Sequence, residues 1–163
     1  NLKDLIIKGF RDAISKLIDY RDIEGEKLKK DMLIKISAIE TQIASLEKKL
    51  PKLLELNRKR LKKRADELAI QIDRDRLDQE MVILANRSDI DEEIVRMRSH
   101  TTEVKRLLDT DKSIGRKLDF LMQEMNREAN TLGSKSLSDV TSGAAIELKV
   151  LIEQIREQVQ NIE

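Results

Sequence analysis

Apolar residues recur along the first fifty positions at the three- and four-residue steps of an α-helix. The first stripe consists of Leu2, Ile6, Phe10, Ala13, Ile14 and Leu17. A second stripe follows the alternating four- and three-residue spacing of a coiled-coil seam, through Leu28, Met32, Ile36, Ile39, Ile43, Leu46 and Leu50. Gly25 lies between the stripes and costs a helix about 1 kcal/mol relative to alanine. We therefore expect a perturbed but continuous helix here, with a functional break in the helix as the alternative.

The only proline in the chain, Pro51, suits the first turn of a second helix, where its missing N–H carries no cost. Beyond it, an apolar stripe continues through Leu53, Leu56, Leu61, Leu68 and Ile72. This pattern predicts a helix that returns antiparallel to the first. Residues 1–75 are thus expected to form a long, coiled-coil-like helical hairpin with its tip near residues 48–64.

The remainder of the chain predicts shorter helices, which together form a smaller bundle domain over residues 76–163. One helix covers 76–85, and the next is capped by Ser88 or Asp89 and runs to about Leu108. Another begins near Gly115 and ends at Gly133, a natural C-terminal residue for a helix. The last helix carries Ala145, Leu148, Leu151, Ile152, Ile155, Val159 and Ile162. The predicted fold class is all-α.

The composition supports this class and excludes several others. Charged residues make up 39% of the 163 positions, aromatic residues 2%, and cysteine is absent. β-sandwiches, TIM barrels and Rossmann domains need more aromatic and β-branched runs, and cysteine-based zinc sites need thiolates. No apolar run approaches the roughly 18 residues of a membrane span, so no membrane association is expected. The chain begins at Asn1, which suggests a fragment of a longer protein.

Positive charge is concentrated between residues 48 and 64. Nine bases and one acid give this window a net charge of +8, whereas the whole chain carries +1. The bases at its centre are Arg58, Lys59, Arg60, Lys62, Lys63 and Arg64. Such a cluster suits a phosphate backbone through Coulomb attraction and counterion release. A solvated helix face explains it equally well, and no interleaved aromatic residue indicates base stacking.

Two predicted helices place charged groups beside their apolar faces. Glu93 and His100, the only histidine, fall on the apolar arc of the helix ending near Leu108. Glu124 and Glu128 lie one turn apart at the border of the next helix's apolar arc. Two ionised carboxylates at this spacing repel unless a positive group lies between them. A divalent metal, a protonated His100, or salt-bridge partners such as Arg127 would each satisfy the pair.

The sequence between Gly115 and Lys135 resembles a known family. The residues that carry the resemblance are the run 115–121, the run Gln123–Thr131, and Ser134-Lys135-Ser136. Further matches are Arg21 with Glu24-Gly25, Arg76-Leu77 with Glu80, Asp89-Ile90 with Glu92-Glu93, Arg96, Ser99-His100, and the C-terminal segment from Glu147 onward. Together they resemble the bacterial YicC-like family across essentially the whole chain.

This resemblance implies a cytoplasmic bacterial endoribonuclease of the stress response. It also implies a metal-dependent enzyme that acts on RNA as an oligomeric ring, with an N-terminal domain that this chain does not contain. We expect His100, Glu124 and Glu128 to be catalytic, and these three with Glu93 to hold Mn²⁺ or Mg²⁺. Arg96, Arg116 and Arg127 are expected to bind phosphate oxygens, and the basic tip to hold the RNA backbone.

Two other functions fit the same pattern. A helical adaptor or homo-oligomerisation protein would explain the seam and the scarcity of aromatic residues without any chemistry. A non-catalytic RNA-binding module would use the charged face only to grip phosphates.

Overall fold

The computed structural model describes residues 2–67, 90–110, 113–136 and 138–160 of the chain. Within these ranges it contains four helices, α1 (Leu2–Glu67), α3 (Asp91–Leu108), α4 (Gly115–Ser134) and α5 (Asp139–Val159). The prediction of an all-α fold is confirmed. None of the described helices combines the length and the apolar composition that crossing a bilayer requires.

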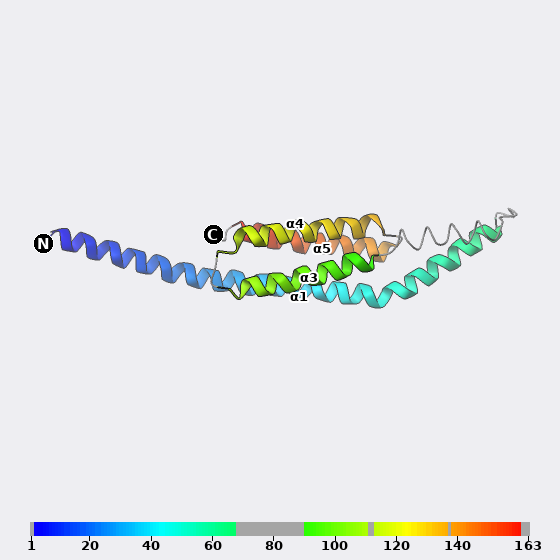
Figure 1. The fold of residues 1–163 in the computed structure, drawn as a ribbon, viewed down its shortest axis with the longest axis horizontal. Helices are drawn as coiled ribbons and strands as arrows, with labels where there is room; N and C mark the ends of the chain where they lie inside the picture. The colour runs from blue at the N-terminus through cyan, green and yellow to red at the C-terminus, as the bar shows by residue number, and fades with distance from the viewer. Residues whose placement is uncertain (1, 68–89, 111–112, 137, 161–163) are drawn as a thin grey trace.

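The middle of α1 packs with the three shorter helices as a four-helix bundle (Figure 1). Helix α1 contacts α3 and α5, and α4 contacts the same two helices from the other side. Neighbouring helices are antiparallel, because Glu40 of α1 pairs with Lys105 of α3 while Glu47 pairs with Arg98, nearer the start of α3. The arrangement is an up-down-up-down bundle.

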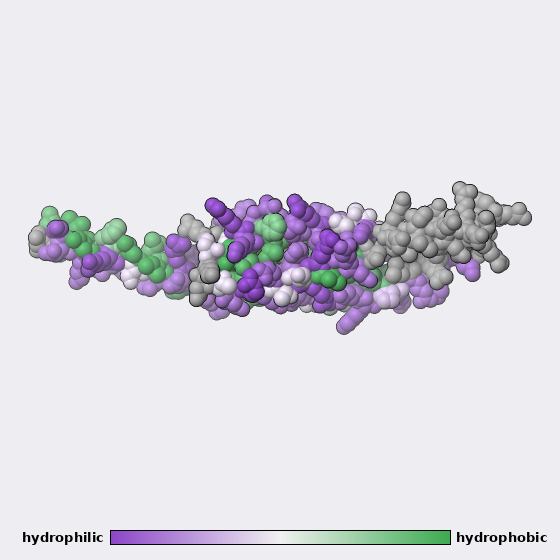
Figure 2. All heavy atoms as spheres, in the orientation of Figure 1, coloured by the Kyte–Doolittle hydropathy of each residue, from purple (hydrophilic) through white to green (hydrophobic). Residues whose placement is uncertain are grey.

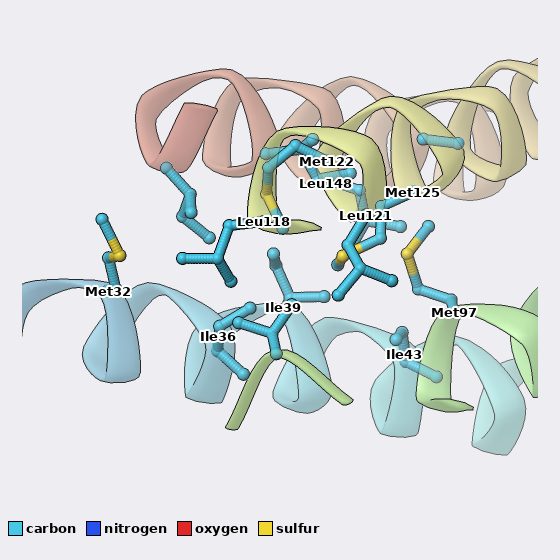
Figure 3. Packing of buried hydrophobic residues seen from close by; sticks show 14 of the residues in the cluster. Met32, Ile36, Ile39, Ile43, Met97, Leu118, Leu121, Met122, Met125 and Leu148 are labelled. Atoms are coloured by element: carbon cyan, nitrogen blue, oxygen red, sulfur yellow. The ribbon is translucent and has the colours of Figure 1, made fainter. Parts of the chain in front are cut away.

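The bundle has one hydrophobic core, to which all four helices contribute (Figure 3). Helix α1 supplies Met32, Ile36, Ile39, Ile43 and Leu46, which are five of the seven residues of its second predicted stripe. Facing them are buried residues of the other helices, including Met97, Leu118, Met122, Met125 and Leu148. The central part of the predicted hairpin therefore belongs to the bundle core and does not build a separate one.

Helix α1 is much longer than the bundle that it joins. At 1.5 Å per residue its 66 residues span about 100 Å, whereas the 18 to 21 residues of the other helices span about 30 Å. It therefore projects beyond both ends of the bundle (Figure 1). One projection carries the first apolar stripe and the other carries the basic cluster.

The predicted turn at Pro51 is wrong. Helix α1 runs through Pro51 without interruption as far as Glu67, so the chain does not reverse there. A proline inside a helix removes one backbone hydrogen bond and bends the axis without necessarily ending the helix. Figure 1 shows α1 changing direction where it leaves the bundle. Among the described helices, the antiparallel neighbours of α1 are α3 and α5, both much later in the sequence.

Several predictions lie outside the described residues. These are the helix over 76–85, the apolar positions Leu68 and Ile72, the caps Ser88 and Asp89, and the domain boundary at residue 75. Helix α3 begins after Ile90, which makes no side-chain capping bond, and three acidic residues in its first turn favour the positive end of the helix. The predicted bounds of α4 agree with the structure to within one or two residues.

Candidate functional site

A buried ion pair joins the start of α3 to the residue that follows α4. The side chain of Glu93 is 7% exposed, and its Oε1 atom lies 2.8 Å from Nζ of Lys135. Its other carboxylate oxygen, Oε2, is buried without a hydrogen-bond partner among the described residues. A buried carboxylate is stable only when a cation compensates its charge, so Lys135 fixes the end of α4 against α3.

A second ion pair links α3 to α4 one turn further along. Arg96 donates a hydrogen bond to Glu92 on its own helix, and its Nη1 atom lies 3.4 Å from Oε1 of Glu128. These two carboxylates, Glu92 first, raise the pKa of Arg96 above its ordinary value. The Glu128 side chain is only 9% exposed, whereas that of Arg96 is 54% exposed. The guanidinium group is thus both anchored and open to solvent.

The antiparallel register set by Arg96 and Glu128 assigns His100 and Glu124 to corresponding positions one turn beyond this pair. His100 follows Arg96 by four residues on α3, and Glu124 precedes Glu128 by four residues on the antiparallel α4. Both residues are half-buried, and Glu124 is paired with Arg127. No hydrogen bond or ion pair of His100 occurs among the residues that the structure describes. We call Glu93, Arg96, His100, Glu124, Glu128 and Lys135 the α3–α4 edge.

The remaining predicted RNA-binding residues do not all lie on this edge. Arg127 is exposed near Glu124, but Arg116 is exposed in the first turn of α4, 12 residues from Glu128. Twelve helical residues correspond to about 18 Å. Lys59, Arg60, Lys62 and Lys63 are exposed on the projection of α1, while the side chains of Arg58 and Arg64 lie outside the described set. The predicted residues thus fall into an edge group and a group on α1, and Arg116 belongs to neither.

The predicted metal ligands do not form a metal site by themselves. Among the described residues, no three histidine, aspartate or glutamate side chains gather closely enough to hold an ion. Glu93, Glu124 and Glu128 each have a cationic partner instead. Among the side-chain oxygen atoms of these predicted ligands, Oε2 of Glu93 alone is buried without a hydrogen-bond partner in the described structure. The carboxylates of Glu93, Glu124 and Glu128 lie on the predicted helix faces, but their charges are balanced by Lys135, Arg127 and Arg96, respectively.

Sequence reasoning did not assign a role to Lys135. Two features of the sequence pointed to Lys135. It directly follows the predicted end of a helix, and the neighbouring predicted helix carries an acidic residue on its apolar face. Lys135 is followed by a cluster of hydroxyl groups that connects α4 to α5. Ser136 bonds to Ser142 at 2.9 Å and to the carbonyl of Ser138 at 3.0 Å, and Ser138 caps α5 by accepting a hydrogen bond from the amide of Thr141. These contacts hold the Lys135 turn in place.

The fold and this edge define an all-helical protein with anchored cations beside half-buried acid–base groups, and comparison with known proteins assigns it to a family. Residues 46–163 match the family model described as "Endoribonuclease YicC-like, C-terminal". The chain belongs to the YicC-like endoribonuclease family.

Two curated relatives extend the similarity to nearly the whole chain. The protein named "Probable endoribonuclease YicC" of Haemophilus influenzae is 40% identical over 158 residues, which cover 97% of this chain and 55% of that relative. The protein of the same name in Clostridioides difficile is 42% identical over 165 residues, with 99% and 56% covered. The chain spans about half the length of these relatives.

Proposed function

We propose that the protein containing this chain is an endoribonuclease and that the α3–α4 edge carries the reaction. The observation that supports this assignment most directly is the family membership, since both relatives bear the name of an endoribonuclease. The edge adds a chemical reason. It combines an exposed guanidinium group on Arg96, which pairs with Glu128, with the half-buried imidazole of His100 one turn further along α3.

Arg96 is suited to bind the scissile phosphate. A guanidinium group donates to phosphate oxygens in pairs and keeps its charge at any physiological pH. Its bonds to Glu92 and Glu128 orient the group before RNA arrives, so less conformational freedom is lost on binding. Glu128 is therefore a positioning residue in this proposal, and Lys135 with Glu93 holds the end of the edge.

His100 is suited to move protons, because imidazole accepts and donates them near neutral pH. In the proposed step, His100 removes the proton of a ribose 2′-hydroxyl, and the 2′-oxygen forms a bond to phosphorus. The bond from phosphorus to the 5′-oxygen breaks, and that oxygen takes up a proton from water. Glu124, opposite His100, would orient the imidazole and stabilise its protonated form.

Dependence on Mn²⁺ or Mg²⁺ is part of the proposal and rests on the resemblance alone. Among the described residues, no three histidine, aspartate or glutamate side chains gather to hold an ion, and the proton transfers above are written with His100 and water. A divalent ion would neutralise charge on the phosphate during cleavage. The resemblance further supports a homo-oligomeric, cytoplasmic protein of the bacterial stress response.

The test uses the full-length natural protein with labelled RNA, in EDTA and with added Mn²⁺ or Mg²⁺. His100→Gln should reduce the cleavage rate by 10²-fold or more, the usual contribution of a general base, while helicity and RNA affinity stay unchanged. Thr102→Ala is the matched control, because the Thr102 hydroxyl is exposed on α3 and bonds only to the Arg98 carbonyl in the described structure. That variant should cleave normally.

Each other outcome selects a different function. Cleavage that persists in His100→Gln would remove the edge as the catalytic site. Salt-sensitive RNA binding without cleavage, with or without metal, would identify a non-catalytic RNA-binding module. Neither binding nor cleavage would favour the helical adaptor.

A further inference from the structure

The N-terminal projection of α1 exposes a large apolar surface that the bundle does not cover. Ten large apolar side chains between residues 2 and 23 are exposed, from 41% for Ile7 to 75% for Leu2. They are Leu2, Leu5, Ile6, Ile7, Phe10, Ile14, Leu17, Ile18, Tyr20 and Ile23. Figure 2 shows this surface as a green band along the projection. We call these ten residues the apolar face.

The apolar face is too wide for pairing with a single helix. At 100° per residue, its side chains spread over about 220° of the helix circumference, an arc that also contains Lys3, Lys16 and Arg21. The opposite arc, about 100° wide, contains only polar residues, namely Asp4, Lys8, Arg11, Asp12, Ser15, Asp19 and Asp22. A two-stranded coiled coil covers a narrow seam, whereas a broad stripe belongs to a helix embedded in a folded core. The shape of this face therefore fits a globular partner that contacts α1 from more than one side.

The comparisons indicate which partner that is. The match to the C-terminal family model begins at residue 46, so the apolar face lies ahead of it. The same face lies inside the region shared with both relatives, since 97% and 99% of the chain align with them. The relatives are nearly twice as long as this chain, and the model that residues 46–163 match is described as C-terminal. We infer that the additional sequence of these relatives lies largely ahead of the matched region, and this sequence is the available occupant.

We propose that residues 2–23 form the final helix of a preceding domain, whose hydrophobic core packs over the apolar face in the longer protein. Contiguous apolar patches of this kind are rarely left uncovered on a soluble monomer. A second copy of this chain is the less suitable occupant, because two such helices would still leave the flanks at Leu5 and Ile18 exposed. The proposal does not depend on ribonuclease activity.

The continuity of α1 gives this docking a structural consequence. Helix α1 runs without a break from the apolar face to Met32, the first buried residue of the bundle core. From Phe10 to Met32 the helix advances about 33 Å. The continuous helix α1 would thus hold a domain docked on the apolar face at a fixed distance from the α3–α4 edge.

The first experiment compares hydrogen exchange in the 163-residue chain and in the full-length natural protein. Amides of residues 2–23 should exchange at least tenfold more slowly in the longer protein, and the ratio should not change on dilution. In the short chain these amides should exchange rapidly while α3–α5 stay protected. Equal exchange in the two proteins would overturn the proposal. So would protection in the short chain that accompanies its oligomerisation, which would identify a second copy as the occupant.

The second experiment places a charge on the apolar face. Phe10→Glu should release the preceding domain of the full-length protein to limited proteolysis at least tenfold faster, while leaving the thermal stability of the 163-residue chain unchanged. Ser15→Glu, on the polar arc of the same segment, is the matched control and should affect neither protein. Loss of stability in the short Phe10→Glu chain would show that Phe10 already serves the bundle and would contradict the proposal.

Discussion

Lys135 lies 2.8 Å from the buried carboxylate of Glu93, and this contact joins the start of α3 to the turn between α4 and α5. The two residues are 42 positions apart in the sequence. The lysine side chain is 30% exposed and the glutamate side chain 7% exposed. Water can therefore stabilise the charge of Lys135, whereas the charge of Glu93 is stabilised mainly by Lys135. The pair is therefore a point at which a small change should have a large effect on stability.

Replacement of Lys135 by methionine should destabilise the protein by about 2 kcal/mol, because Glu93 would keep its charge in a buried site without a cation. Urea unfolding followed by circular dichroism measures the change. Lys149→Met, which removes an exposed lysine from α5, should cost less than about 0.5 kcal/mol. The double variant Glu93→Leu, Lys135→Met should recover most of the loss, since apolar replacement of a buried pair is often neutral. Additive losses in the double variant would contradict this account.

The bidentate pair of Arg106 and Glu103 on α3 predicts a specific pH dependence. The guanidinium donates to both carboxylate oxygens, at 2.7 and 2.6 Å, and these bonds lower the pKa of Glu103 against the opposing effect of burial. A carboxylate whose pKa is lower in the folded state stabilises that state above its ordinary pKa, about 4.3. This stabilisation is lost as the pH falls through the lowered value.

Arg106→Gln should therefore move the pKa of Glu103 upward, toward its ordinary value. An NMR titration of the Glu103 carboxyl carbon measures the shift. Lys105→Gln is the control, since the Lys105 ammonium pairs with Glu40 of α1 rather than with Glu103. A Glu103 pKa that moves equally in both variants would show that long-range charge, and not the bidentate contact, sets it.

The prediction from sequence succeeded where a local pattern determined the structure. The three- and four-residue spacing of apolar residues from Met32 to Leu46 identified buried positions. A helix that packs on one side must repeat its apolar residues at this spacing. The prediction at Pro51 was wrong because the unfavourable effect of proline inside a helix was interpreted as a reversal of the chain. Proline costs a helix interior about 3 kcal/mol relative to alanine, but lysine- and leucine-rich residues on both sides favour helix, and α1 continues through Pro51.

The candidate site was only partly predictable for a different reason. Helical spacing brought His100, Glu124 and Glu128 to a common edge, and the antiparallel register of α3 and α4 agrees with that placement. Spacing within a helix does not reveal which cation from another helix compensates each acid. Lys135 became the partner of Glu93 only through the tertiary contact, so the predicted metal ligands were found beside protein cations.

Gly25 provides a test of whether α1 is continuous between its two apolar stripes. The residue is exposed inside the helix, and an added Cβ atom would meet no other atom within 4 Å. Gly25→Ala should therefore favour the helix by about 1 kcal/mol, which corresponds to about fivefold slower amide exchange in the surrounding turns. Gly25→Pro should have the opposite effect, because proline removes a helical hydrogen bond and clashes with the preceding turn. Unchanged exchange in both variants would mean that the helix is already broken there.

The basic residues on the second projection of α1 predict a salt-dependent contribution to RNA binding. Lys59, Arg60, Lys62 and Lys63 are exposed beyond the bundle, where a nucleic-acid backbone can approach them without displacing the core. Each phosphate that such a residue neutralises releases counterions. Replacing all four by glutamine should weaken single-stranded RNA binding and flatten the plot of log K against log salt by about 0.7 for each phosphate that is no longer neutralised.

Fluorescence anisotropy of a labelled RNA at several salt concentrations measures this slope in the full-length protein. The control variant replaces four other exposed lysines, Lys8, Lys16, Lys30 and Lys149, by glutamine. It removes the same total charge from other parts of the molecule. Equal losses of affinity in the two variants would show that only the overall charge attracts RNA. A loss confined to the variant on the α1 projection would place the RNA backbone along that segment, which is continuous with the part of α1 that packs in the bundle.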